Sequence, residues 1–273
     1  MDYGINNTNG RVSQSEIEKI LNFAWKNNIN TIDTAKSYGD SELFIGNCIN
    51  QRKDWKWDII TKISYVKNLV DQIQDTIKKI KLTPIKILAH SADLFINNKF
   101  QSEIQKAKAK NLVSKIGVSL YSEIEINKIL ESGFKPDIIQ IPMNILDTRL
   151  YRKNILTELK KKEIEIHVRS VFLQGLFYLS DSNISKLFPD ALFYINKLKH
   201  ISFDAGVNLS ELSLLWLVGL EEVSKIIIGV DNASQLSSHL STLKKEVEPS
   251  VFEKALNLKY ENENTLNPSL WKN

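Results

Sequence analysis

Short apolar runs alternate along the chain with longer stretches in which apolar residues recur every three or four positions. The short runs, such as "WDIITK", "IKILAH" and "KIIIGV", are rich in isoleucine and do not alternate strictly with polar residues. This is typical of strands that are buried on both faces. The longer stretches have the spacing of amphipathic helices. The alternation of the two patterns predicts parallel strand–helix units.

The first helical stretch, residues 13–28, places Ile17, Ile20 and Leu21 on one face. It opens with Ser13 and Glu16, whose spacing predicts a capping box at the helix N-terminus. The same reading predicts further helices at residues 41–51, 66–80, 190–205 and 209–220.

The predicted strands end near residues 33, 62, 90, 119, 141, 170 and 229, and the first three intervals are 29, 28 and 29 residues long. A doubly wound sheet would carry a G-x-G-x-x-G turn after its first strand, and the sequence has none. Seven such units therefore favour a (β/α)₈ barrel of the TIM type. We expect residues 1–273 to form one domain of this kind, with an irregular tail from about 262 to 273.

Composition narrows the class of protein. With 42% hydrophobic and 25% charged residues, the 273-residue chain has the composition of an ordinary globular protein. Its net charge of +4 is spread along the sequence and gives no argument for a nucleic-acid partner. Cys48 is the single cysteine, which excludes an internal disulfide, favours a cytoplasmic location and predicts a buried thiol. The sequence has no run of 18 apolar residues that would predict a membrane span and no ligand spacing that would predict a zinc site.

Three consecutive predicted strands end in an ionisable residue. Asp33 ends the first, Lys62 the second and His90 the third, and Tyr38 follows Asp33 in "TIDTAKSYGDSE". Because the carboxyl ends of barrel strands form one rim, with neighbouring strands about 4.8 Å apart, we expect these groups to converge. Each alone has a structural explanation: a helix cap, a surface lysine, a core histidine or a packed aromatic. Their combination favours a catalytic site.

The four residues suit proton transfer to a carbonyl oxygen. A free phenol has a pKa of about 10, and we expect the ammonium of Lys62 to lower the pKa of Tyr38. A carboxylate such as Asp33 can hold the lysine in a dry site, and a neutral His90 can donate a hydrogen bond to a substrate oxygen. Such a set stabilises an oxygen that becomes an alkoxide. His167 and His200 are expected to be structural.

The stretch "DTAKSYGDSE" resembles the aldo-keto reductase signature D-T-A-x-x-Y-G-x-S-E at every position, and Lys62 and His90 match the remaining members of the family's catalytic tetrad. Weaker similarity continues through residues 116–121, 138–147, 168–176 and 226–240, so that it covers nearly the whole chain in order.

The resemblance implies an NAD(P)H-dependent reductase of a small aldehyde, ketone or sugar carbonyl, with Tyr38 as the proton donor. It implies NADP(H), the family default, with NAD(H) left open. By position, Ser119 and Gln140 would bind the carboxamide and Arg169 would take the place of an aromatic residue that stacks on the nicotinamide. The resemblance assigns the remaining cofactor contacts to Ser170, Gln174 and Gly175 along the pyrophosphate and to Gly229, Gln235 and His239 around the adenosine.

Several positions depart from the family pattern. Leu120 replaces an asparagine that would bind the nicotinamide, His239 replaces a usual asparagine, and Asp231 lies near positions where many members carry basic residues. The similarity begins at Tyr3, so we expect a barrel without its first strand, through either a misassigned start codon or a shortened chain. Leu120 and the absent strand favour an alternative, a cofactor-binding regulatory or low-activity barrel of the same family. A barrel without redox activity also stays open.

Overall fold

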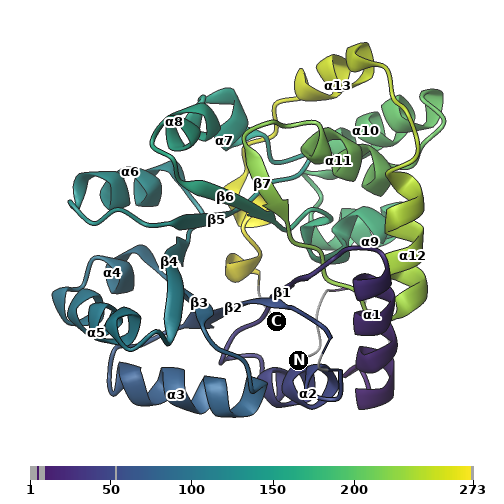
Figure 1. Cartoon of the computed structure of the whole chain (residues 1–273). Helices are drawn as coiled ribbons and strands as arrows, with labels where there is room; N and C mark the ends of the chain where they lie inside the picture. Colours follow the sequence, from purple (N-terminus) through teal and green to yellow (C-terminus); the bar gives the residue numbers. More distant parts are fainter. Residues whose placement is uncertain (1–4, 6–9, 53, 272–273) are drawn as a thin grey trace.

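The computed structural model describes residue 5 and residues 10–52 and 54–271. In these residues seven parallel strands pair in sequence order and curl into an incomplete barrel (Figure 1). The strands are β1 (Thr31–Asp33), β2 (Asp58–Ile63), β3 (Ile85–Ala89), β4 (Val113–Ser119), β5 (Ile138–Pro142), β6 (Glu165–Arg169) and β7 (Val223–Ile226). The (β/α)₈-type fold predicted from the sequence is confirmed, and its first strand, β1, has no strand before it among the described residues.

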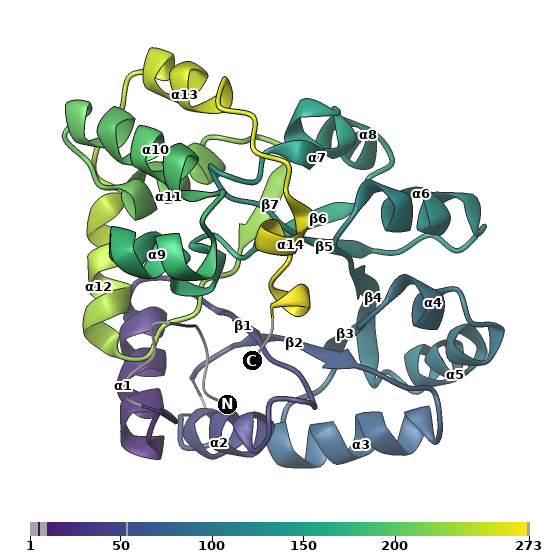
Figure 2. The same ribbon diagram turned by 180° about the vertical axis from the view of Figure 1, so that it is seen from behind.

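Helices lie mainly outside the curled sheet, and the last of them, near the C-terminus, lies in front of its centre in Figure 2 (see also Figure 1). They are α1 (Gln14–Lys26), α2 (Ser41–Ile49), α3 (Leu69–Ile80), α4 (Ala92–Phe95), α5 (Asn98–Ala109), α6 (Glu123–Glu131), α7 (Arg149–Arg152), α8 (Ile155–Lys161), α9 (Asp181–Leu187), α10 (Leu192–Asp204), α11 (Leu209–Val218), α12 (Ala233–Thr242), α13 (Pro249–Leu256) and α14 (Glu263–Leu266). Two 3-10 turns, η1 (Leu173–Tyr178) and η2 (Pro268–Leu270), complete the description. The five helices predicted from periodicity correspond to α1, α2, α3, α10 and α11.

The predicted capping box of α1 is only half formed. Ser13 Oγ accepts the N–H of Glu16 at 3.3 Å, as expected. The carboxylate of Glu16 does not return to Ser13, because it accepts the N–H of Ala233 at 3.1 Å and pairs with Lys19 at 3.1 Å. Helices α1 and α12 lie side by side (Figure 1). A tertiary contact has therefore replaced the local one, which no local sequence pattern reveals.

The sheet is open between β1 and β7. Within the described part of the chain, β1 pairs with β2 alone and β7 with β6 alone. Lys225 of β7 donates a hydrogen bond to Thr31 Oγ1 of β1 at 2.7 Å, which links the two edges. An apolar hollow of about 450 Å³ lies beside this link, lined in part by Ile32, Leu214 and Ile226. Among the described residues, the barrel therefore has seven strands and one open edge.

Side chains inside the barrel form three layers. The middle layer consists of Ile60, Leu88 and Ile138, which are fully buried. Gly117 lies in the same layer, because a Cβ at this position would be 2.7 Å from Leu88 Cδ2. The lower ionic layer, toward the amino ends of the strands, consists of Asp58, Lys86, Lys115, Glu165 and Lys225. The upper polar cluster, toward the carboxyl ends, consists of Asp33, Lys62, His90, Ser119, Gln140 and Arg169.

The C-terminal tail packs against segments that follow the carboxyl ends of β5 and β6. Tyr260 donates a hydrogen bond to Asp190 at 2.6 Å, and Arg149 of α7 lies 3.5 Å from Glu263. Within residues 262–271, α14 and η2 are single helical turns, and the indole N–H of Trp271 bonds back to Thr265 at 3.0 Å. The tail therefore lies near the rim that carries the upper polar cluster.

Three further observations concern membrane-spanning helices, metal sites and the single cysteine. No single helix of the described residues has the length and apolar character of a membrane span, and α10 and α11 reach it together only as a pair bent by 78°. In the same residues, no group of three or more His, Cys, Asp and Glu side chains is placed to hold a metal ion. Cys48 is buried, as predicted.

Candidate active site

A buried ion pair lies at the centre of the upper polar cluster. The ammonium of Lys62, at the end of β2, donates to Asp33 Oδ1 at the end of β1, and the two side chains are 2% and 9% exposed. Burial lowers the pKa of Lys62, and the charge of Asp33 opposes this shift. Asp33 Oδ2 accepts a further hydrogen bond from Gln140 Nε2 at 2.8 Å. The predicted convergence of Asp33 and Lys62 is therefore present, and Gln140 joins it.

Tyr38 lies beside this pair because the chain turns sharply after β1. The N–H of Tyr38 bonds to Ala35 O at 2.9 Å, and Gly39 takes a left-handed conformation with φ of 60°. Lys62 Nζ lies 5.5 Å from the centre of the Tyr38 ring. The short loop thus returns the phenol over the strand ends, as the sequence predicted.

The expected lowering of the pKa of Tyr38 is wrong. Burial, reinforced by the charge of Asp33, raises the pKa of Tyr38 to about 12, and Arg169 only partly opposes this. The charge of Lys62 is compensated by its partner Asp33, so burial dominates. The phenol therefore carries its proton at neutral pH, which is the form that a proton donor requires.

His90 follows β3 and extends it by one bond, since its N–H bonds to Ile63 O at 2.9 Å. Its Nδ1 lies 3.1 Å from Ser64 Oγ. Partial burial lowers the pKa of His90, and the positive charges of Lys62 and Arg169 lower it further. The imidazole is therefore neutral at pH 7. Ser64 was not predicted, although its position two residues after Lys62 places it on the same face of the chain.

Arg169, at the end of β6, is held by the chain itself. Its guanidinium carbon lies 4.2 Å from the centre of the Tyr121 ring, within cation–π distance. Its amino groups lie 3.3 Å from Leu120 O and 3.4 Å from Ser170 Oγ. Sequence reasoning missed Tyr121. The positive charge of Arg169 reaches the site, since it acts to lower the pKa values of Tyr38, Lys62 and His90.

Ser119 and Gln140 are both buried next to the ion pair. Ser119 Oγ lies 3.5 Å from Gln140 Oε1, while the amide nitrogen of Gln140 is bonded to Asp33. The two residues expected to bind a carboxamide therefore lie together in the upper polar cluster. The structure adds a contact to Asp33 that the sequence did not suggest.

A separate pocket of about 290 Å³ lies between the loop after β6 and the N-terminal part of α12. The loop curls because Ser170, Gln174 and Gly175 adopt left-handed conformations, with φ of 60°, 50° and 94°. Six residues predicted to bind a cofactor line this one pocket: Ser170, Gln174, Gly175, Gly229, Gln235 and His239. Phe172, which was not predicted, stacks on His239 at 4.7 Å between ring centres. A pocket of this size suits a nucleoside.

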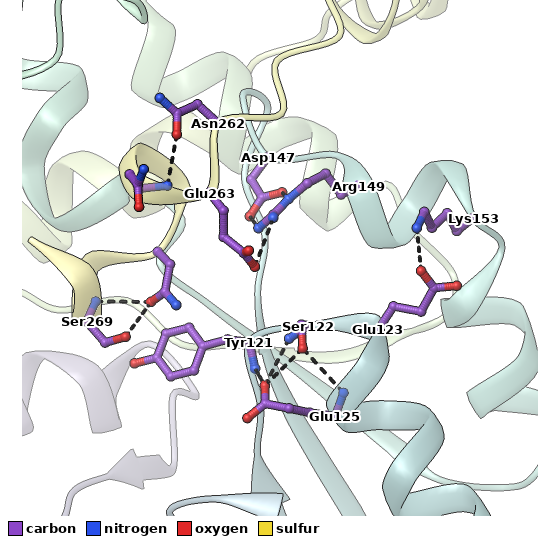
Figure 3. A network of polar contacts seen from close by, with 12 residues as sticks. Tyr121, Ser122, Glu123, Glu125, Asp147, Arg149, Lys153, Asn262, Glu263 and Ser269 are labelled. Atoms are coloured by element: carbon purple, nitrogen blue, oxygen red, sulfur yellow. Dashed lines mark hydrogen bonds and ion pairs between the residues drawn. The ribbon is translucent and has the colours of Figure 1, made fainter.

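A polar network holds the loops after β4 and β5 and the tail in place (Figure 3). Glu125 accepts the N–H groups of Tyr121 and Ser122 at 2.7 and 3.1 Å. These bonds fix the backbone of Tyr121, whose ring packs against Arg169. Arg149 bonds to both oxygens of Asp147, at 2.8 and 3.0 Å, and reaches Glu263 in the tail. These contacts hold the loops after β4 and β5 and the tail together beside the rim. The sequence did not predict them.

Comparison with known proteins gives a consistent result. The sequence profile described as the aldo/keto reductase family matches residues 2–257. The fold is similar to that of the aldo-keto reductase AKR11C1 from Bacillus halodurans in its holo form, with a TM-score of 0.76 and 16% sequence identity. The similarity covers 92% of this chain and 91% of that one.

Proposed function

The chain belongs to the aldo/keto reductase family, and we propose that it is an NAD(P)H-dependent reductase of a small aldehyde, ketone or sugar carbonyl. The observation that carries the proposal is the buried Lys62–Asp33 pair beside a protonated Tyr38. A dry ion pair next to a phenol is a costly arrangement for stability alone. It is well suited to stabilising charge that develops on a substrate oxygen.

Tyr38 donates a proton to the carbonyl oxygen in this proposal. An alkoxide is more basic than a phenolate, so a phenol with a pKa of about 12 remains an adequate acid. Lys62 stabilises the phenolate that forms, because its ammonium lies over the same ring. Asp33 and Gln140 position Lys62, and neutral His90 donates a hydrogen bond to the carbonyl oxygen.

The hydride for the carbonyl carbon would come from a nicotinamide cofactor bound at this rim. The residues present fit such a cofactor, because the upper polar cluster and the nucleoside-sized pocket both lie toward the carboxyl ends of the strands. Ser119, Gln140 and Arg169 would hold its nicotinamide end. Ser170, Gln174, Gly175, Gly229, Gln235 and His239 would hold the rest.

The test is a fluorescence titration of the full chain with NADH and with NADPH, followed by cofactor oxidation with a panel of aldehydes, ketones and sugars. We expect saturable binding of at least one nucleotide and oxidation that requires a carbonyl compound. A folded protein that binds neither nucleotide would contradict the proposal.

A second candidate is a cofactor-binding barrel of low activity. Leu120, a buried apolar residue where the family pattern has an amide, favours this reading. Tight nucleotide binding without carbonyl-dependent oxidation across the whole panel would support it.

A further inference from the structure

The N-terminus of α12 borders the nucleoside-sized pocket, and several of the backbone N–H groups there already have acceptors. A helix N-terminus ordinarily attracts phosphate, because its N–H groups are free. Here the N–H of Ala233 bonds to the carboxylate of Glu16 at 3.1 Å. The N–H groups of Gln235 and Asp231 bond to Asn232 Oδ1 at 2.8 Å and to Gln235 Oε1 at 2.7 Å. A phosphate would have to displace these acceptors, one of which is charged.

The pocket itself also carries a negatively charged side chain, that of Asp231. Asp231 is a lining residue, and its carboxylate has no hydrogen bond or ion pair with the described residues. No lysine or arginine lines the pocket within that part of the chain. His239 adds no positive charge at neutral pH, because burial lowers its pKa. Arg169 touches Ser170 at 3.4 Å, but its guanidinium stacks on Tyr121 in the upper polar cluster.

We propose that this pocket selects a nucleotide whose adenosine ribose carries free hydroxyl groups, so that the chain uses NAD(H) in preference to NADP(H). The inference rests on the proposed function and reverses the family default expected from the sequence. Asp231 accepts hydrogen bonds from the ribose hydroxyls, the role that acidic residues have in other NAD sites. Glu16 occupies the position in which the helix would otherwise stabilise a 2′-phosphate.

The size of the preference follows from the exposure of the pocket. A 2′-phosphate in the pocket would face Asp231 with no lysine or arginine among the described residues that line the pocket. Glu16 lies at the edge of this site and is paired with Lys19 at 3.1 Å, so it contributes less of the repulsion than Asp231 does. Both carboxylates are partly exposed, so water screens part of the repulsion. We expect NADH to bind about tenfold to a hundredfold more tightly than NADPH at low ionic strength.

The experiment is a fluorescence titration of the full chain with NADH and NADPH, repeated as a competition with 5′-ADP and 2′,5′-ADP. The two competitors report on the adenosine end without the nicotinamide. Asp231→Asn and Glu16→Gln remove one charge each, and the glutamine retains an oxygen that can accept the N–H of Ala233. Each of these two substitutions should reduce the ratio of the NADH affinity to the NADPH affinity several-fold. Asp231→Arg should reverse the preference, so that NADPH binds more tightly than NADH.

Matched controls separate local charge from net charge. Glu18→Gln makes the same change on an exposed position of α1, and Glu246→Gln does so beyond the end of α12. Neither should alter the ratio of the two affinities. The unfolding midpoint of each variant shows whether the fold is retained.

The outcomes are distinct. NADPH binding as tightly as NADH, or more tightly, in the parent chain would overturn this inference and leave the proposed function intact. If the ratio of the two nucleotide affinities were unchanged in both Asp231→Asn and Glu16→Gln, the assignment of the preference to these residues would be wrong. Binding of neither nucleotide would overturn the proposed function itself, and the inference with it.

Discussion

The two ends of the barrel interior carry similar charged groups in different surroundings. In the lower ionic layer, Lys86 and Asp58 form an ion pair at 2.6 Å and are 13% and 29% exposed. In the upper polar cluster, the Lys62 and Asp33 side chains are only 2% and 9% exposed. The apolar layer of Ile60, Leu88 and Ile138 separates the two ends.

The two ends also differ in how their charges are satisfied. In the lower ionic layer, each charged group has a partner of opposite charge, and Asp58 has two, because Lys225 lies 3.7 Å from the same carboxylate oxygen that Lys86 contacts. Above, one buried pair is surrounded by groups without a charged partner in the described residues, namely Tyr38, His90 and Arg169. A layer of shared, partly hydrated ion pairs suits structural support. A dry pair beside unpaired acids and bases suits catalysis.

The largest predicted effect is that of Lys62→Met. It leaves Asp33 buried without a cation, which costs about 3–5 kcal/mol of unfolding free energy. It also removes the charge that stabilises the Tyr38 phenolate, so turnover should fall by about a hundredfold to ten-thousandfold. Urea unfolding and carbonyl-dependent cofactor oxidation measure the two effects.

The double variant Asp33→Asn, Lys62→Met is the control for this comparison. Neutralising both partners should restore most of the stability, because no buried charge remains alone. Turnover should stay low. If Lys62→Met kept turnover within a few-fold of the parent, the upper polar cluster would differ from the lower ionic layer in burial alone.

The next effect concerns His167, which lies between the two charged ends and is fully buried. Burial lowers the pKa of His167 to about 4, and Glu165, 3.5 Å away, only partly opposes this. The folded state therefore binds fewer protons than the unfolded state below a pH of about 6.5, so stability falls as the pH drops from there toward the folded pKa. The loss attributable to His167 is about 3 kcal/mol.

Urea unfolding of the parent and of His167→Asn at neutral and acidic pH measures this contribution. The difference in unfolding free energy between the two proteins should shrink or change sign as the pH falls. A difference that stays constant over this range would show that the imidazole titrates normally.

The smallest effect is expected for Lys86→Met in the lower ionic layer. Asp58 keeps Lys225 as a partner and is partly exposed, so the loss should be about 1 kcal/mol. Turnover should remain within about twofold of the parent, since the apolar layer isolates the site. The same two assays measure both values, and a large loss of turnover would refute the division of the barrel into two ends.

Much of the fold could be predicted from the sequence. The predicted strand ends near 33, 62, 119 and 141 agree within one residue with the ends of β1, β2, β4 and β5. Strand β7 ends at Ile226 and not near 229. In the part of the chain that the structure describes, β7 borders the open edge and has no second strand partner that would continue it. The periodicity of apolar residues indicates which residues of a strand or helix are buried. The residue at which a strand ends depends on how far the neighbouring strands continue to pair with it, and this is not visible in the periodicity.

The site was predictable where residues lie at strand ends, and less so elsewhere. Asp33, Lys62 and His90 follow from the rule that carboxyl ends share a rim. The contacts of Glu16 with Ala233 and of Tyr121 with Arg169 join distant segments, so no local pattern indicates them. The raised pKa of Tyr38 depends on its burial, which spacing cannot provide. The lower ionic layer did leave a signal, a charged residue near the start of successive strands, as in "WDIITK" and "IKILAH".

The most direct test of the account is the Tyr38→Phe variant, compared with Tyr65→Phe as a matched control. Tyr65 is an exposed tyrosine shortly after β2, and its loss should change neither binding nor turnover. Tyr38→Phe should bind NADH or NADPH as the parent does and lose carbonyl-dependent cofactor oxidation by about a hundredfold or more. Oxidation at the parental rate in Tyr38→Phe would contradict the role of Tyr38 as proton donor.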